Sequence, residues 1–283
     1  MPIIANGKEI AEKIYSEIKS EIVKNGYKPR LSIILTNDNE SGKIYVRNKI
    51  KAAEKTGIQT DLTIFPANVS ETELLNKIRE LNNDVTTDAI LVQLPLPAQI
   101  DPEKISDAIL PEKDADGFHF SNAGKLFEGR KPLVAPCTPS GILYLLDEYK
   151  IDLAGANAVV IGRSNIVGKP VAQMLLQRNA TVSILHSKTK NLQIFTKNAD
   201  LIVCATGHAG LLTGNDVKEG VVIIDVGISR VDGKLKGDVD FDSVYPKAKL
   251  ITPVPGGVGP LTIAMLAKNT LELHKNKLRN VKQ

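Results

Sequence analysis

The feature that most constrains the fold of this chain is a repeated alternation of short apolar runs with segments of helical periodicity. In the first part, apolar runs at 31–36, 60–65 and 89–93 are predicted strands, and helical segments lie before and between them. Strands that alternate with helices are typical of βαβ units and of a mostly parallel sheet. The sequence therefore predicts an α/β protein, and 283 residues suffice for one large or two ordinary domains.

Two helices of the first part have clear signals. Isoleucine recurs every fourth residue near the N-terminus, at Ile10, Ile14, Ile18 and Ile22, which gives an apolar face. Ser70 and Glu73 have the spacing of a capping box, in which each side chain accepts a hydrogen bond from the other residue's backbone N–H. Three apolar residues follow on one face of that predicted helix, namely Leu74, Ile78 and Leu81.

The second part contains a strand, a glycine-bearing turn and a helix in immediate succession. The predicted strand 158–162 leads into a turn with Gly162 and Gly168, and a helix follows to about Gln177. A Rossmann unit places backbone N–H groups against a pyrophosphate in this way, although Ser164 replaces a glycine of the GxGxxG pattern. A tight turn without a ligand is the alternative. Further strands are predicted at 181–185, 201–205 and 221–225, and a helix at 263–273.

The residues after the next strand bear on the choice of cofactor. An NAD site usually has an acidic side chain there for the ribose hydroxyls, whereas residues 186–190 read HSKTK. Ser187, together with Arg163 next to the first glycine, favours a ribose 2′-phosphate and therefore NADP over NAD. Basic residues on an ordinary solvated loop are the alternative.

The stretch 110–139 is rich in proline and glycine, and it is predicted to be either a linker or a set of functional loops. Thr138 and Pro139 then have the pattern of an N-cap and a first-turn proline. They predict a helix that runs to about Tyr149.

Four side chains of the first part form a candidate acid–base site. Tyr45 and Lys49 lie four residues apart on a predicted helix, so both point from one face. Gln93 ends a predicted buried strand, and Asp116 lies in a loop. A lysine near an amide and a carboxylate is suited to proton transfer, because burial and neighbouring charges can bring a lysine pKa toward neutrality. For Tyr45 and Lys49, an ordinary amphipathic pair on a solvated helix is the alternative.

Composition limits the other classes of function. Charged residues make up 24% of the chain, the net charge is +4, and no Lys/Arg cluster is interleaved with aromatic residues, so no nucleic-acid partner is expected. Cys137 and Cys204 are far apart and are expected to be packing residues without a disulfide. Single, scattered histidines argue against a metal site, and Asp238 and Asp240 are expected in turns or caps.

The sequence also predicts a cytoplasmic protein. The N-terminus lacks the apolar core of a signal peptide. No apolar run approaches the roughly 18 residues that a membrane-spanning helix needs, so no membrane partner is expected.

Eight longer strings carry a resemblance to a known family. In chain order they are YxxxK at 45–49, VQLPLP at 92–97, KDADGF at 113–118, PCTP at 136–139, GRSNIVGKP at 162–170, DVGI at 225–228, GDVD at 237–240 and TPVPGGVGPLT at 252–262. They extend over nearly the whole chain. Through them the chain resembles the bifunctional methylenetetrahydrofolate dehydrogenase/methenyltetrahydrofolate cyclohydrolase family.

The resemblance implies two reactions and a set of site residues. A hydride passes from 5,10-methylenetetrahydrofolate to NADP, and water then opens the methenyl cation to 10-formyltetrahydrofolate. By the family pattern, Lys49 is the central catalytic group, with Tyr45 stacked beside the folate, Gln93 bonded to Lys49, and Asp116 on the pterin ring. The implied substrate-binding residues are Tyr45, Gln93, Asp116, Pro255, Gly256 and Gly257, and the implied cofactor-binding residues are Gly162, Arg163, Ser164, Gly168, Ser187 and Ile228.

The resemblance also implies two α/β domains with a cleft. Residues 1–139 would form the catalytic, folate-binding domain, and 140–262 a Rossmann-type NADP-binding domain. The helix 263–283 is expected to return to the first domain, because it follows a glycine-rich loop that must reach the folate. A homodimer is expected by analogy, because the family is usually dimeric.

Departures from the family pattern are small. Ala115 replaces the usual valine and Leu261 the usual methionine, and residues 133–135 are less usual.

Two other hypotheses stay open. A dehydrogenase that uses NADP or NAD and lacks the hydrolytic step is disfavoured by the presence of Lys49, and a non-catalytic nucleotide-binding module is disfavoured by the four-residue constellation.

Overall fold

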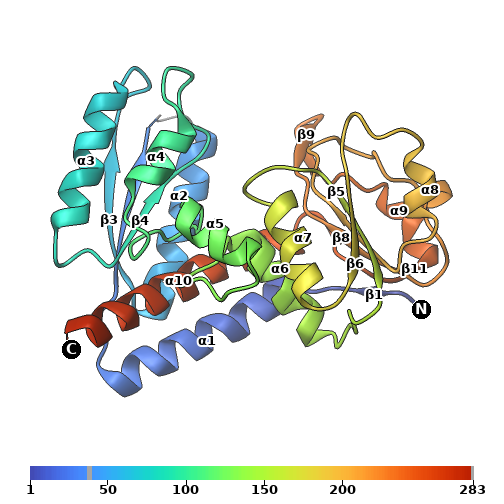
Figure 1. The fold of residues 1–283 in the computed structure, drawn as a ribbon, viewed down its shortest axis with the longest axis horizontal. Coiled ribbons are helices and arrows are strands. Elements are labelled where there is room, and N and C mark those ends of the chain that lie inside the picture. Colours follow the sequence, from blue (N-terminus) through green and yellow to red (C-terminus); the bar gives the residue numbers. More distant parts are fainter. Residues whose placement is uncertain (37–39, 282–283) are drawn as a thin grey trace. The chain divides into compact units, whose positions relative to one another are not determined.

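The computed structural model describes residues 1–36 and 40–281, which form two compact units (Figure 1). The three-stranded unit comprises Glu12–Cys137 together with the chain from Ile263 onward. The six-stranded unit comprises Met1–Ala11 and Thr138–Thr262. Of the helices in the described residues, none is both long and apolar enough to cross a bilayer.

The three-stranded unit is built on a parallel sheet. Strand β2 (Arg30–Leu35) lies between β3 (Gln59–Ile64) and β4 (Ala89–Val92). These bounds confirm the three predicted strands to within one residue at each end. Every residue of β4 is buried, as expected for a continuous apolar run in a parallel sheet.

The helices of this unit include the three that were predicted in the first part of the chain. They are α1 (Gly7–Asn25), α2 (Glu40–Thr56), α3 (Glu71–Asn83), α4 (Pro102–Ala108), α5 (Phe120–Phe127) and α10 (Val258–Val281), of which α1 and α10 begin in the other unit. Ser70 caps α3 in a complete capping box with Glu73, as predicted. The predicted apolar face of α3 is buried in one core with Ile34 and Ile90.

The six-stranded unit has one parallel sheet in the order β1-β11-β8-β7-β5-β6. Its strands are β1 (Ile3–Ile4), β5 (Asn157–Ile161), β6 (Thr181–Leu185), β7 (Leu201–Cys204), β8 (Val221–Asp225) and β11 (Ala248–Ile251). Because β5 pairs with β6 on one side and β7 on the other, the strand order reverses at β5. Open α/β sheets bind ligands at the carboxyl ends of strands at such a switch point.

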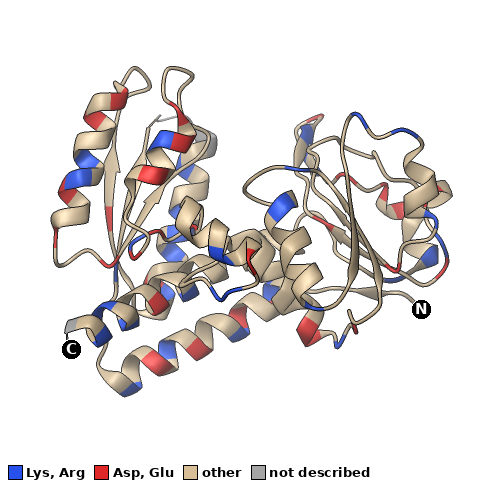
Figure 2. Ribbon diagram, viewed as in Figure 1, with Lys and Arg blue, Asp and Glu red and all other residues tan. Residues whose placement is uncertain are grey.

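Short elements complete this unit. They are α6 (Cys137–Glu148), α7 (Gly168–Gln177), α8 (Leu192–Thr196), α9 (Phe241–Val244), two 3₁₀ turns (Gly214–Asp216 and Tyr245–Lys247), and a hairpin of β9 (Ser229–Val231) and β10 (Lys234–Lys236). Figure 2 shows that basic and acidic residues are interspersed along the helices of each unit.

Two boundaries differ from the predictions. Residues 1–11 belong to the six-stranded unit and not with residues 12–137, because β1 pairs with β11 through Ile3–Leu250 and Ile4–Ile251. Helix α10 begins at Val258, five residues before the predicted start. Pro260 is tolerated there because the first turn of a helix does not use the missing N–H.

Two further expectations in the stretch 110–139 were wrong. It contains helix α5, whose N-cap is His119, with Nδ1 accepting the N–H of Ser121 at 3.1 Å. Thr138 is not an N-cap, because α6 already begins at Cys137. The Thr138 hydroxyl instead bonds the Thr262 hydroxyl at 2.8 Å.

Candidate functional site

Helix α2 and the end of β4 bring two of the predicted catalytic side chains together. Lys49 Nζ donates a hydrogen bond to Gln93 Oε1 at 2.9 Å. Gln93 Nε2 in turn donates to the Leu94 carbonyl at 2.6 Å, so the amide is oriented with its oxygen toward the lysine. Tyr45 lies one turn earlier on α2 and is 45% exposed. Its ring is therefore accessible to a ligand.

Asp116 reaches this place because its loop pairs with the sheet. The Ile90 N–H donates to the Lys113 carbonyl at 2.7 Å, and the Ala115 N–H donates to the Ile90 carbonyl at 3.2 Å. The segment therefore runs beside β4 and forms an isolated parallel β-bridge between Asp114 and Ile90. Burial raises the pKa of Asp116 to about 6; the positive charge of Lys49 acts in the opposite direction, and Asp114 adds to the rise.

Polar residues that the sequence analysis did not assign hold this loop. The Lys113 ammonium donates to three backbone carbonyls, those of Leu81, Asn82 and Asp84. The buried carboxylate of Asp114 accepts the N–H groups of Gly117 and His119 and the side-chain amide of Asn122. Such a loop has little freedom, which fixes the position of Asp116.

Asn269 on α10 is a second support that the sequence analysis missed. Its Nδ2 donates to the carbonyls of Ala115 and Ala135, at 2.9 and 3.0 Å, and contacts Cys137 Sγ at 3.4 Å. Burial raises the pKa of the Cys137 thiol well above its usual value, which agrees with a packing role. The sequence feature that could have pointed to Asn269 is its position, because this polar residue shares the apolar face of α10 with Leu266 and Leu273.

The glycine-bearing turn of the six-stranded unit connects β5 to α7. A side chain at Gly162 would collide with the Ala205 carbonyl, and one at Gly168 with the Gly162 carbonyl. Gly162 also has a φ of +127°, in the region that favours glycine. The Ser164 hydroxyl accepts the N–H groups of Val167 and Gly168, so this serine stabilises the turn itself.

The other predicted cofactor residues lie near the carboxyl ends of neighbouring strands. Arg163 follows Gly162 after β5, Ser187 follows β6, and Ile228 follows β8. All three side chains are exposed. The turn and these side chains therefore surround the carboxyl-terminal edge of the sheet near its switch point, where an anionic dinucleotide would bind.

Pro255, Gly256 and Gly257 form part of the loop between β11 and α10. A side chain on Gly7, at the start of α1, would overlap the Gly257 carbonyl and approach that of Gly256. Close packing of two backbone segments within the six-stranded unit therefore explains why Gly7 has no side chain.

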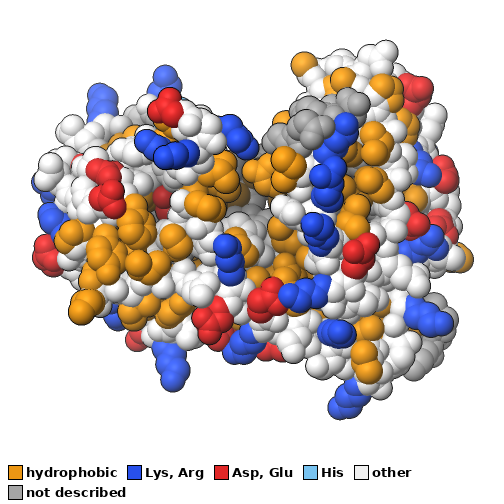
Figure 3. Space-filling model, turned by 180° about the vertical axis from the view of Figure 1, so that it is seen from behind, with side chains coloured by type: hydrophobic (Ala, Val, Ile, Leu, Met, Phe, Trp, Pro, Cys, Tyr) orange, Lys and Arg blue, Asp and Glu red, His pale blue; other side chains and the backbone are white. Residues whose placement is uncertain are grey.

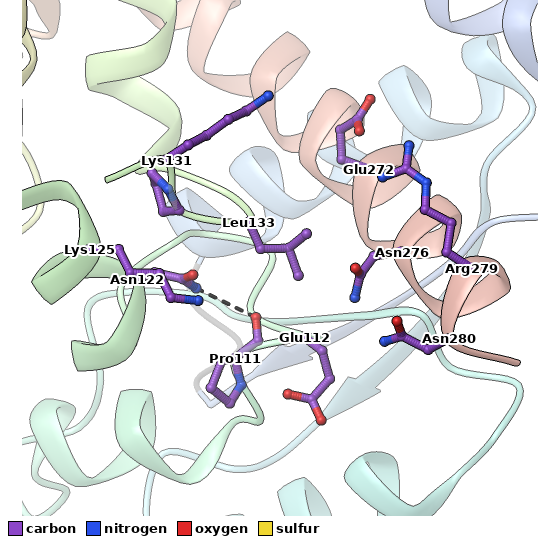
Figure 4. A pocket seen from close by; sticks show the side chains of 11 residues that line it. Pro111, Glu112, Asn122, Lys125, Lys131, Leu133, Glu272, Asn276, Arg279 and Asn280 are labelled. Atoms are coloured by element: carbon purple, nitrogen blue, oxygen red, sulfur yellow. Dashed lines mark hydrogen bonds between the residues drawn. The ribbon is translucent and has the colours of Figure 1, made fainter. Parts of the chain in front are cut away.

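A solvent-open cavity of about 640 Å³ in the three-stranded unit contains none of the predicted site residues (Figure 4). Its walls come from the 111–133 segment and from α10. They carry the basic side chains of Lys125, Lys131 and Arg279 as well as the acidic ones of Glu112 and Glu272. This cavity is therefore a different place from the polar cluster around Lys49.

The comparisons with known proteins show to which family the chain belongs. Residues 5–116 match the family model of the tetrahydrofolate dehydrogenase/cyclohydrolase catalytic domain, and residues 136–278 match that of the NAD(P)-binding domain of the same family. A curated relative, "Bifunctional protein FolD" of Sulfurihydrogenibium sp., is 52% identical over 281 residues, which are 98% of this chain and 99% of the relative.

Solved structures resemble the chain over almost its full length. The bifunctional FolD enzyme of Campylobacter jejuni is 47% identical with a TM-score of 0.95, over 98% of this chain and 99% of the other. The Trypanosoma brucei FolD, which was solved with NADP and an inhibitor, is 38% identical with a TM-score of 0.94, over the same shares of the two chains.

Proposed function

Because the chain belongs to the tetrahydrofolate dehydrogenase/cyclohydrolase family, we propose that it performs both reactions of the bifunctional members. It oxidises 5,10-methylenetetrahydrofolate to the 5,10-methenyl form with NADP and hydrolyses the latter to 10-formyltetrahydrofolate. The observation that carries this proposal is the hydrogen bond from Lys49 to Gln93, with Asp116 close enough to interact with the lysine charge. The relatives named above as bifunctional match the chain from end to end.

In the proposed hydrolysis, Lys49 is the base. The methenyl substrate is a cation, so a neutral amine is favoured beside it and can take a proton from the attacking water. The water oxygen bonds to the methenyl carbon and gives one proton to Lys49. The bond between this carbon and N5 then breaks, the hydroxyl proton is lost and N5 takes up a proton, which leaves the formyl group on N10 and releases one proton overall. Gln93 holds the amine through the 2.9 Å hydrogen bond. Tyr45 stacks beside the folate, and this role, like the binding of folate by Pro255, Gly256 and Gly257, is part of the proposal.

The cofactor of the proposed dehydrogenase is NADP, which supplies the hydride acceptor when bound. Support comes from the turn that contains Gly162, Ser164 and Gly168 and follows β5, and from the absence of a carboxylate in the segment 186–190 after β6. Arg163 and Ser187 would bind the 2′-phosphate, and Ile228 would line the cofactor. The family model is described only as NAD(P)-binding, so the preference needs its own test.

Absorbance assays test the two reactions separately. Formation of the methenyl compound from the methylene substrate with added NADP reports the dehydrogenase, and loss of supplied methenyltetrahydrofolate without NADP reports the cyclohydrolase. We expect both. Oxidation without enzyme-dependent hydrolysis would instead identify a monofunctional dehydrogenase, and the absence of both would leave a nucleotide-binding module.

Binding of the folate should depend on pH through Asp116. The carboxylate is proposed to accept two N–H donors of the pterin, and its pKa is raised to about 6 by burial. As pH falls through about 6, the group becomes protonated and loses an acceptor, so the KM for folate should rise. Asp116→Asn should raise this KM about tenfold or more at pH 7.5, because hydrogen bonds to a charged group are worth roughly 1.5–3 kcal/mol.

Stability gives an independent control for the same variant. The folded-state pKa of Asp116 lies above its value of 3.8 in a free chain. Between about pH 4 and 6 the folded protein therefore holds a proton that the unfolded chain has released, and stability falls as pH rises through this window. The Asp116→Asn variant should not show this fall in stability, and at pH 7.5 it should melt at a higher temperature than the wild type. If the KM of Asp116→Asn depended on pH as that of the wild type does, Asp116 would not be the group that binds the pterin.

We propose that the enzyme acts in the cytoplasm as a homodimer. Both cysteines are buried and free, which suits a reducing compartment.

Strand β6 is an edge strand, and Ile184 on it is exposed. Figure 3 shows hydrophobic side chains gathered on the surface of the six-stranded unit, at the left of that view. Sedimentation equilibrium should give about twice the chain mass of 30.7 kDa, whereas a mass equal to that of one chain would exclude the dimer.

A further inference from the structure

The open cavity of about 640 Å³ in the three-stranded unit has no role in the function proposed above. Figure 4 shows that its side chains come from two walls, the 111–133 segment on one side and helix α10 on the other. Cavities of this volume are in the range that holds small organic ligands. None of the residues proposed for the folate or for the cofactor lines it, so an occupant would be a further ligand.

The walls of the cavity carry an excess of positive charge. Three basic side chains line it, namely Lys125, Lys131 and Arg279. None of the three forms an ion pair or a side-chain hydrogen bond within the part of the chain that the structure describes. Of the two lining carboxylates, Glu272 accepts a hydrogen bond from Lys275 at 2.7 Å, which offsets its charge. The cavity therefore favours an anion.

Asn122 gives the cavity a buried acceptor that has no donor. This residue is 1% exposed, and its Nδ2 donates to Asp114 Oδ2 at 3.0 Å and approaches the Pro111 carbonyl at 3.5 Å. Its Oδ1 has no hydrogen-bond partner among residues 1–36 and 40–281. Buried acceptors are rarely left unpaired in proteins, because the loss of hydration is not repaid. An O–H or N–H group of an occupant would supply the missing bond.

The cavity has further hydrogen-bonding groups of both kinds. The carboxylate of Glu112 accepts hydrogen bonds, and it forms no ion pair within the described residues. The amides of Asn276 and Asn280 on α10 can both donate and accept. An occupant should therefore combine an anionic group with several hydrogen-bond donors.

These two requirements match the two parts of a phosphorylated sugar. A phosphate monoester carries nearly two negative charges at neutral pH, and an arginine can meet it with two parallel hydrogen bonds. A carboxylate typically accepts the hydroxyl groups of a ribose, as it does in NAD sites. A simple carboxylic acid would bring less charge to the three basic side chains and no hydroxyl donors to the acceptors.

We propose that this cavity binds a small organic phosphate with vicinal hydroxyl groups, which is either a sugar phosphate or a nucleoside monophosphate. Arg279, Lys131 and Lys125 bind the phosphate group. Glu112 and Asn122 accept hydrogen bonds from the hydroxyl groups. The inference goes beyond the two folate reactions proposed above and does not depend on them.

Calorimetric titration of the full-length protein with ribose 5-phosphate tests the site, and inorganic phosphate is the probe for the anion alone. We expect ribose 5-phosphate to bind about tenfold more tightly than inorganic phosphate, because only the sugar brings donors to the two acceptors. AMP distinguishes the two sources of the ligand. Tighter binding of AMP than of ribose 5-phosphate would identify a nucleoside monophosphate, and weaker binding a sugar phosphate.

Arg279→Gln should raise the Kd for both probes by about tenfold or more, because it removes charge-assisted hydrogen bonds to the phosphate. The side chain is exposed, so the fold and both absorbance assays should be unaffected. Arg130→Gln is the matched control, because Arg130 is exposed next to Lys131, pairs with Glu128 and does not line the cavity. It should leave both Kd values unchanged.

Glu112→Gln separates the two parts of the site. Loss of this carboxylate removes a negative charge near the phosphate, so inorganic phosphate should bind more tightly. Ribose 5-phosphate loses a charged acceptor at the same time, so its advantage over inorganic phosphate should fall about fivefold. A variant that merely destabilised the protein would weaken both probes together and would not change their ratio.

Three results would overturn the inference. The first is no binding of ribose 5-phosphate or AMP at millimolar concentration. The second is binding that Arg279→Gln leaves intact and Arg163→Ala abolishes, which would place the ligand at the glycine-bearing turn. The third is tighter binding of a dicarboxylate, such as malate, than of ribose 5-phosphate. Each would leave the proposed folate reactions untouched, because the absorbance assays measure those reactions without any of these probes.

Discussion

Replacement of Lys49 by alanine should lower the rate of methenyltetrahydrofolate hydrolysis by about 10²–10⁴-fold, the usual contribution of a positioned acid–base group. No other amine is hydrogen-bonded to Gln93 in the described structure, so no neighbour can replace the base. The dehydrogenase should lose less, because the hydride leaves the substrate without a proton transfer to water. Both rates are measured by absorbance on the same preparation.

Lys51→Ala is the matched control, because this lysine is exposed on the same helix and should be neutral in both assays. Gln93→Ala should reduce hydrolysis about tenfold by releasing the amine. Because the two residues act as one unit, the double variant should be no slower than Lys49→Ala alone. Normal hydrolysis by Lys49→Ala would show that another group activates the water.

Local patterns predicted the parts of the fold that depend on local physics. The apolar runs at 31–36 and 89–93 mark strands because a strand buried on both faces of a parallel sheet must be continuously apolar. The capping box at Ser70 was visible because its hydrogen bonds connect residues only three apart. The same holds for the turn between β5 and α7, in which strand, glycines and helix are consecutive.

Parts of the fold that depend on distant residues were not predictable from periodicity. The two residues of β1 pair with β11, about 245 positions away, and nothing local distinguishes Ile3 and Ile4 from an ordinary N-terminal tail. Helix α5 was missed because its sequence, FSNAGKLF, is short, contains a glycine, and has a histidine as its cap. Its neighbours in the loop, and not its propensity, fix its conformation.

The same division applies to the candidate site. Lys49 and Gln93 were paired through the family resemblance, and their contact follows from the position of Gln93 at the end of a buried strand. The supports Asn269 and Lys113 were missed because their roles depend on carbonyl groups far away in sequence. The cofactor role of Ser164 stays a prediction, and the structure adds that its hydroxyl accepts backbone N–H groups of its own turn.

Arg163 should decide between the two nicotinamide cofactors. A ribose 2′-phosphate carries nearly two negative charges, and a guanidinium can meet it with two parallel hydrogen bonds. Arg163 directly follows Gly162 and is exposed, so its side chain is available for such a ligand. Arg163→Ala should raise the KM for NADP by about tenfold or more and leave that for NAD nearly unchanged, since such contacts are worth roughly 1.5–3 kcal/mol.

Graded variants separate charge from geometry at this position. Arg163→Lys keeps the charge but loses the paired hydrogen bonds, so its KM for NADP should lie between those of the wild type and Arg163→Ala. Ser187→Ala should raise the KM for NADP by a smaller factor and leave the KM for NAD unchanged. Arg178→Ala, at the other end of α7 and paired with Asp147, serves as the control and should change neither constant. If Arg163→Ala weakened NADP and NAD equally, the arginine would be binding a group that both cofactors share, such as the pyrophosphate, and the preference for NADP would have to come from the basic segment after β6.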